Sequence, residues 1–318
     1  MRVAAIDVGT NSIRLLVADV DGARGETSAL HTVARAGEPC RLGRGLGQSG
    51  RIADEMAERA SGLVLEFARR ARSLGAKHIV LGATAALRSA SNGAEVAERL
   101  ASQAGVSARI LTGEDEARLV YRSVVLGLGA GVGRNACVVF DLGGGSTEII
   151  SGVGPESGRW VSLPLGAVNL TERFISHDPP LDHEVATLSE HVGQELMHGC
   201  ASLPAATPML AGVGGTVTLI GMLDHQLSSY DPVALEGWAV ARDRLDPLVA
   251  RLTRLNHTER MALPAMGEGR ADIVIAGALA VQQIARRFPS ASLICSTQGL
   301  RYGLARLAAE EALDLSAE

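Results

Sequence analysis

Apolar and polar positions along this chain follow two different periods, and together they predict an α/β protein. Short apolar runs bounded by turn residues, such as Arg2–Ile6, Ile13–Val20 and Cys137–Phe140, are typical of buried strands. Longer segments with apolar residues at helical spacing, such as 52–74 and 273–288, predict helices. Because strands and helices alternate, we expect a sheet covered by helices.

Two strand–turn–strand segments in this pattern are built alike, 134 positions apart. In each, an apolar strand runs into an acidic residue (Asp7 or Asp141), then a turn containing glycine and a hydroxyl residue, then a second strand. Glycines let backbone N–H groups approach an anion, serine and threonine add donors, and the aspartate can hold a hydrated divalent cation. The repeat predicts a duplicated domain whose halves face each other across a phosphate.

Composition narrows the class of protein further. A length of 318 residues suits two domains, and 47% hydrophobic residues suffice for two cores. A net charge of −5 argues against a general nucleic-acid binder, and no apolar run has the roughly 18 residues of a membrane span. The four cysteines are scattered without a Cys-x-x-Cys motif, so we expect buried reduced thiols and a cytoplasmic protein.

Several other segments carry candidate chemistry. Lys77 is the only lysine and no Walker loop is present, so phosphate contacts must come from arginines, backbone amides and a metal. A glycine-rich loop is predicted over Gly37–Gly50, after a strand near Glu26–Val33, and it carries Arg41 and Arg44 with Arg51 just beyond. The acidic triplet Glu114–Glu116, taken alone, is more typical of a helix N-terminus than of a catalytic site.

Taken in order, these motifs resemble the exopolyphosphatase/guanosine pentaphosphate phosphohydrolase (Ppx/GppA) family of the actin/Hsp70/sugar-kinase fold. The resemblance spans essentially the whole chain. Its motifs are Asp-x-Gly-Thr-Asn-Ser at 7–12, Arg41–Gly43, Ala83–Arg88 with Asn92, Thr112–Arg118, Asp-x-Gly-Gly-Gly-Ser-Thr-Glu at 141–148, Leu163–Val168, Gly212–Thr216, Arg270–Val274 and Gly299–Arg301.

The resemblance implies a duplicated, ribonuclease H-like α/β fold with two domains and an interdomain cleft. We predict an N-terminal domain over 1–126, with residues 299–318 returning to it, and a C-terminal domain over 127–298. The glycine-rich stretch Gly127–Gly133 is the predicted joint, about which the domains close on the substrate.

The resemblance also implies the site. Glu116, which precedes the alanine of the family's Gly-x-Glu-Glu-Ala motif, is the predicted general base, and Arg88 is predicted to bind phosphate. Asp7, Asp141 and Glu148 are predicted to hold Mg²⁺ or Mn²⁺, with Glu148 also orienting the attacking water. Phosphate is predicted to bind at Gly9, Thr10, Asn11, Ser12, Gly143, Gly144, Gly145, Ser146, Gly214, Gly215 and Thr216. By itself the Gly214–Thr216 junction is more typical of close packing.

The chain departs from the family pattern at two positions. Asp115 stands where the family usually has glutamate, a change we expect to be silent. Asn169 stands where many members have arginine, which removes one predicted contact to a polyanion.

The function implied by the resemblance is release of terminal orthophosphate from inorganic polyphosphate by attack of water. Hydrolysis of guanosine pentaphosphate (pppGpp) to the tetraphosphate uses the same chemistry and remains open. An actin-like ATPase and a phosphotransferase are more distant alternatives. We expect a polyphosphate or nucleoside polyphosphate substrate, no nucleic-acid or membrane partner, and leave a homodimer open.

Overall fold

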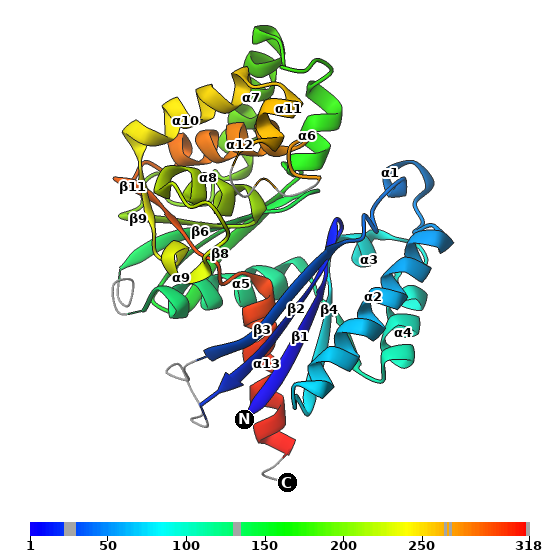
Figure 1. Cartoon of the computed structure of the whole chain (residues 1–318). Helices are drawn as coiled ribbons and strands as arrows, with labels where there is room; N and C mark the ends of the chain where they lie inside the picture. Colours follow the sequence, from blue (N-terminus) through cyan, green and yellow to red (C-terminus); the bar gives the residue numbers. More distant parts are fainter. Residues whose placement is uncertain (22–29, 130–134, 264–265, 267–268, 316–318) are drawn as a thin grey trace. The chain divides into compact units, whose positions relative to one another are not determined.

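The computed structural model describes residues 1–21, 30–129, 135–263, 266 and 269–315 (Figure 1). The chain divides into two compact units. Unit 1 comprises Met1–Ser123 and Leu300–Glu318, and unit 2 comprises Val124–Gly299. Among the described residues, no helix combines the length and apolar character needed to cross a membrane.

Unit 1 is built on a five-stranded sheet of order β3-β2-β1-β4-β5. β1, β2 and β3 are antiparallel, whereas β4 and β5 run parallel to β1. The carboxyl ends of β1, β4 and β5 therefore meet at one edge of the sheet, which is where open α/β sheets bind ligands. The strands span Arg2–Val8 (β1), Ser12–Val20 (β2), Leu30–Pro39 (β3), His78–Ala83 (β4) and Ser107–Ile110 (β5).

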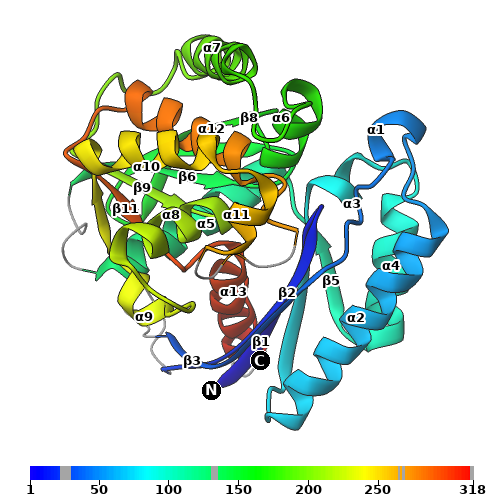
Figure 2. The ribbon, with the colours of Figure 1, turned by 45° about the horizontal axis from the view of Figure 1, so that its top comes forward.

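Helices cover both faces of this sheet, because the strands are apolar on both. Ala4, Ile6 and Val8 of β1 pack into a core with α2 and α4. On the opposite face, α13 packs against β1, β2 and β4 (Figure 2). The approach is close there, since a Cβ added to Gly82 of β4 would lie 2.5 Å from Leu304 of α13. The helices span Leu46–Ser49 (α1), Asp54–Ser73 (α2), Ala85–Ser89 (α3), Gly93–Ala104 (α4), Gly113–Leu128 (α5, which continues into unit 2) and Leu300–Leu315 (α13).

Unit 2 is built on a six-stranded sheet of order β10-β11-β9-β6-β7-β8. β6, β9 and β11 are parallel, and β7, β8 and β10 are each antiparallel to their neighbours. Three parallel strands again end at one edge. The strands span Ala136–Leu142 (β6), Thr147–Val153 (β7), Glu156–Leu163 (β8), Met209–Val213 (β9), Ala239–Ala241 (β10) and Ser292–Cys295 (β11).

The helical layer of unit 2 is organised around α12. Eleven of its 14 residues are buried, and it packs against α6, α7, α8 and α10. A helix that is apolar all round belongs inside a protein, so α12 forms the centre of this core. The helices span Ala167–Phe174 (α6), Asp182–Gly199 (α7), Gly215–His225 (α8), Pro232–Leu235 (α9), Arg242–Arg254 (α10), His257–Met261 (α11) and Val274–Arg287 (α12).

The two units repeat one topology, with β1–β4 of unit 1 corresponding to β6–β9 of unit 2. Some local predictions differ from the structure. The loop predicted over Gly37–Gly50 is too long, because pairing with β2 continues β3 to Pro39, and α1 forms within the loop. The predicted joint Gly127–Gly133 begins inside α5, and its residues 130–133 lie outside the described residues. The start of the strand predicted near Glu26–Val33 also lies outside them.

Candidate functional site

The first predicted phosphate loop, Gly9–Ser12, joins β1 to β2 in unit 1. The Gly9 N–H donates to the backbone oxygen of Ser12 over 3.1 Å, which closes the turn. The carbonyls of Thr10 and Asn11 accept hydrogen bonds from the segment that follows β3, at distances of 2.9–3.0 Å. In the described part of the chain, the N–H groups of Thr10 and Asn11 donate to no protein acceptor. The carbonyls of this loop are therefore hydrogen-bonded within the protein, whereas its N–H groups remain available to an anion.

The second loop, Gly143–Ser146, repeats this construction in unit 2. The Gly143 N–H donates to the Ser146 oxygen over 3.0 Å, and the carbonyls of Gly143 and Gly144 accept from the first amides of α6. A Cβ on Gly166 would lie 2.2 Å from the Gly144 oxygen, so only glycine permits this approach. Within the described residues, the N–H groups of Gly144 and Gly145 also donate to no protein acceptor.

Asn169 has a structural part in this second loop. Its Nδ2 donates to the Gly145 oxygen over 2.9 Å, which braces the loop against α6. The departure from the arginine of many family members therefore adds a support for the loop carbonyls.

The acidic residues before the two loops occupy matching places but face different residues on the neighbouring strand. Asp7 of β1 lies directly opposite Arg14 of β2. Burial raises the pKa of the Asp7 carboxyl, and the charges of Arg14 and Arg301 partly oppose this shift. The 134-residue offset of the sequence repeat places Glu148 at the position of Arg14, so the repeat itself contains this change of charge.

In unit 2, Asp141 of β6 lies directly opposite Glu148 of β7. Glu148 is only 4% exposed, and its Oε1 accepts hydrogen bonds from Ser146 Oγ and Ser162 Oγ, both at 2.8 Å. Its Oε2 accepts no hydrogen bond from the described residues. The sequence did not predict a role for Ser162 of β8, because only the pairing of β7 with β8 brings it beside Glu148.

Glu116 and Arg88 meet at the strand-end edge of unit 1. Arg88 lies on α3, which follows β4, and Glu116 lies in the first turn of α5, which follows β5. Arg88 Nη1 donates to Glu116 Oε2 over 3.1 Å and to the Leu111 carbonyl over 2.8 Å. Among the described residues, Nε and Nη2 of Arg88 donate to no acceptor. The guanidinium therefore holds the carboxylate and keeps donors for a phosphate.

The other two acidic residues of the triplet, Glu114 and Asp115, do not pair with Arg88. Asp115 accepts a hydrogen bond from Thr112 Oγ1 over 2.7 Å, and the Asp115 N–H donates back to that oxygen over 3.1 Å. This reciprocal arrangement caps the helix. Glu114 is exposed. The helix-cap interpretation thus applies to Asp115, whereas Glu116 is the acid that pairs with Arg88.

The third glycine segment, Gly214–Thr216, begins α8 at the carboxyl end of β9. Gly214 has φ 110°, and a Cβ there would lie 2.5 Å from the Leu142 oxygen. Thr216 is buried against Gly277 of α12. Close packing therefore accounts for Gly214 and for the Thr216 side chain. The Arg270 guanidinium lies beside Gly215, 3.8 Å from the position a Cβ would take.

Cys40, Cys137, Cys200 and Cys295 are free and buried, which confirms the prediction of buried thiols.

The three predicted metal ligands come from both units: Asp7 belongs to unit 1, and Asp141 and Glu148 belong to unit 2. Within the described residues of each unit, no three acidic, histidine or cysteine side chains form a metal-binding group. The predicted three-residue metal site stays a prediction.

Comparison with known proteins extends these observations. The Ppx/GppA phosphatase family matches residues 16–309. Exopolyphosphatase 2 of Mycobacterium tuberculosis is 37% identical over 293 residues, which cover 90% of each chain. Exopolyphosphatase 1 of the same species is 33% identical over 306 residues, which cover 96% of this chain and 87% of that protein.

Solved structures resemble the chain over nearly its full length. The crystal structure of the Aquifex aeolicus member of the Ppx/GppA family superposes with a TM-score of 0.84 at 28% identity, covering 99% of this chain and 98% of that one. An exopolyphosphatase from Cytophaga hutchinsonii gives a TM-score of 0.85 at 23% identity, with 98% of each chain covered, and shows the fold alone. The predicted duplicated α/β fold is confirmed.

Proposed function

The chain belongs to the Ppx/GppA phosphatase family, and from this premise we propose that it is an exopolyphosphatase. The reaction is release of the terminal orthophosphate from inorganic polyphosphate by water. Relatives named exopolyphosphatase, 33–37% identical over most of the chain, support this substrate. The cytoplasm is the proposed compartment, in keeping with four buried free thiols.

The observation that carries the proposal is the Arg88–Glu116 pair at the strand-end edge of unit 1. Hydrolysis of a phosphoanhydride needs a carboxylate that orients water and a cation that offsets charge on the phosphate oxygens. Both groups are present, 3.1 Å apart, and Arg88 retains donors that no described residue uses. A phosphotransferase can use such a pair on a bound acceptor hydroxyl, so the choice of water as acceptor is supported by the relatives named exopolyphosphatase.

In the proposed reaction, the free amides of the phosphate loops bind phosphate oxygens and Arg88 binds the terminal phosphate. Glu116 orients a water molecule and takes one of its protons. The water oxygen bonds to the terminal phosphorus as the bridging P–O bond breaks. The products are orthophosphate and a chain shorter by one phosphate, which leaves on its bridging oxygen.

Asp141 and Glu148 are the proposed principal ligands of Mg²⁺ or Mn²⁺. Two carboxylates directly opposite on neighbouring strands repel each other, and a cation between them would remove this repulsion. Oxygen donors of this kind suit both ions. When bound, such an ion neutralises phosphate oxygens and so favours departure of the leaving phosphate. Asp7 has arginine counter-charges in its own unit, so we give it a lesser share of this role.

The test is phosphate release measured side by side on tripolyphosphate, long-chain polyphosphate, pppGpp and ATP, each with Mg²⁺, with Mn²⁺ and with excess EDTA. We expect kcat/KM to be highest on a polyphosphate and activity to vanish with EDTA and return with metal. A higher kcat/KM on pppGpp would replace the proposal by the nucleotide reaction. Hydrolysis of ATP alone would indicate an actin-like ATPase.

A further inference from the structure

The segment that connects β3 to α2 has an unusual charge. Between Glu38 and Asp54 it contains Arg41, Arg44 and Arg51 and no acidic residue. We call residues 40–52 the arginine arch. All three arginine side chains are exposed, and none has a hydrogen-bond or ion-pair partner among the described residues. By contrast, many arginines of unit 1 pair with carboxylates, namely Arg2, Arg88, Arg109, Arg118 and Arg122.

One end of the arch is bonded to the first phosphate loop. The N–H groups of Cys40 and Arg41 both donate to the Asn11 carbonyl over 2.9 Å, and the Gly43 N–H donates to the Thr10 carbonyl over 3.0 Å. These bonds hold the loop in place through its carbonyls, and its Thr10 and Asn11 N–H groups donate to no acceptor among the described residues. Arg41 is therefore attached, through its own backbone, to the loop that we propose binds phosphate.

The other end of the arch is bonded to the turn that follows α3. Asn92 is buried, and its side chain bonds both backbone groups of Ile52. Its Oδ1 accepts a hydrogen bond from the Ile52 N–H over 2.9 Å, and its Nδ2 donates to the Ile52 carbonyl over 3.0 Å. The Ser91 N–H donates to the Gly50 carbonyl over 2.9 Å. Because α3 carries Arg88, the arch connects the phosphate loop to the helix of the proposed phosphate-binding arginine.

The backbone of the arch keeps an arginine where glycine would fit better. Arg41 has φ 55°, in the left-handed region that disfavours residues with a Cβ, whereas Gly45 and Gly50 take similar values as glycines. Strained residues of this kind cluster at functional sites. The strain at Arg41 therefore suggests that its side chain has a use.

We propose that the arginine arch is a subsite for the phosphates of polyphosphate that follow the terminal one. The inference rests on the proposed function and names its substrate more closely. An inorganic chain carries a negative charge on every further phosphate, and the three exposed arginines supply positive charge that attracts such a polyanion. A nucleoside polyphosphate carries a base in place of further phosphates, and residues 39–53 contain no aromatic side chain on which a base would stack.

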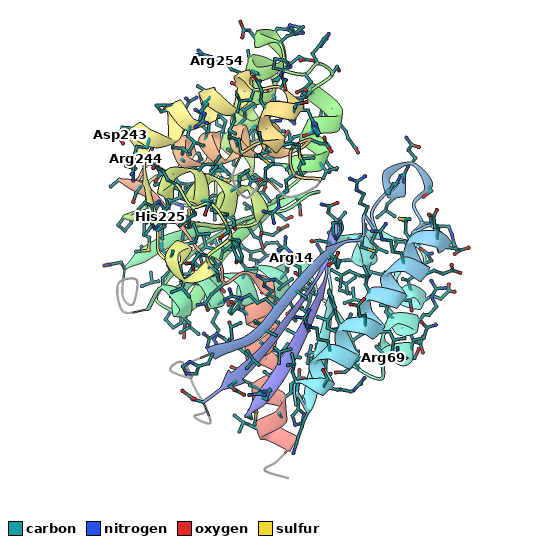
Figure 3. All side chains as sticks on the ribbon, viewed as in Figure 1. Arg14, Arg69, His225, Asp243, Arg244 and Arg254 are labelled. Atoms are coloured by element: carbon teal, nitrogen blue, oxygen red, sulfur yellow. The ribbon has the colours of Figure 1, made fainter. Side chains whose placement is uncertain are left out.

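The experiment compares the wild type with the triple variant Arg41→Gln, Arg44→Gln, Arg51→Gln. Initial rates are measured on tripolyphosphate and on long-chain polyphosphate at several salt concentrations. We expect the ratio of kcat/KM on the long chain to that on tripolyphosphate to fall about tenfold, since exposed charge pairs contribute small factors that multiply. The salt dependence of the long-chain reaction should weaken. The matched control is Arg69→Gln, which removes an exposed arginine from α2 (Figure 3).

A second variant separates binding from stability. Arg41→Gly removes the side chain and relieves the left-handed backbone, so we expect a higher Tm together with a higher KM for long-chain polyphosphate. A triple variant whose chain-length ratio stays within about twofold of Arg69→Gln, in an enzyme whose wild type hydrolyses polyphosphate, would overturn the subsite. Failure of the wild type to release phosphate from any polyphosphate would instead overturn the proposed function.

Discussion

Replacing Glu116 by glutamine tests the proposed general base most directly, because the change keeps the side chain's size and removes its basicity. Loss of a general base typically lowers kcat by about 10²–10⁴-fold, which is roughly 2.7–5.5 kcal/mol in the activation barrier. Binding of polyphosphate should largely persist, since the phosphate loops and Arg88 are unchanged.

The effect on folding stability should be much smaller. The pair with Arg88 joins side chains that are 14% and 31% exposed, and partly exposed ion pairs contribute about 1 kcal/mol or less. Loss of a negative charge in the first turn of α5 adds about 0.3–1 kcal/mol. We therefore expect Tm to fall by only a few degrees.

Glu114→Gln is the matched control, because it removes the same charge from the same helical turn at an exposed position. The assay is phosphate release at saturating polyphosphate, with Tm and polyphosphate binding measured on each variant. Glu114→Gln should keep wild-type kcat. If Glu116→Gln retains more than about a tenth of wild-type kcat, or if both variants lose activity equally, the assignment of the base is wrong.

Four further predictions concern Asp7, Asp141, Glu184 and the cysteines. Asp7→Asn should raise Tm at pH 7 and lower activity, because burial raises the pKa of Asp7 and its ionisation therefore costs stability as pH rises; an unchanged or lower Tm would contradict this. Asp141→Asn should raise the metal concentration needed for half-maximal activity, and an unchanged titration would remove Asp141 from the metal site. His177 hydrogen-bonds Glu184 and lowers its pKa from 4.5 to about 2, so Glu184 stabilises the fold above pH 4.5 and this contribution disappears as pH falls toward 2. Above pH 4.5 the Tm of Glu184→Gln should therefore lie furthest below that of the wild type, and the two Tm values should converge as the pH falls toward 2. Native protein should react slowly with a thiol reagent and denatured protein at all four cysteines, because burial raises the pKa of Cys200 to about 11 and that of Cys295 to about 12; fast labelling of the native protein would refute this.

Features that depend on one continuous segment of the chain could be predicted from the sequence alone. Each phosphate loop is one short segment whose glycines follow an apolar strand, so its turn depends on local backbone freedom and could be predicted. The repeat of that segment predicted the duplication that the two sheets show. Local pattern also predicted buried thiols, since the cysteines lie among apolar neighbours.

What the tertiary structure decided was which polar side chains meet. The acidic triplet alone favoured a helix cap; the fold assigns that cap to Asp115 and brings Glu116 to Arg88, a residue 28 positions away. Strand pairing placed an arginine opposite Asp7 and a glutamate opposite Asp141, so the residues that face these two aspartates across the strands carry opposite charges. Such pairings depend on how distant strands and helices pack, whereas the sequence by itself determines only the local turns and the apolar faces that drive this packing.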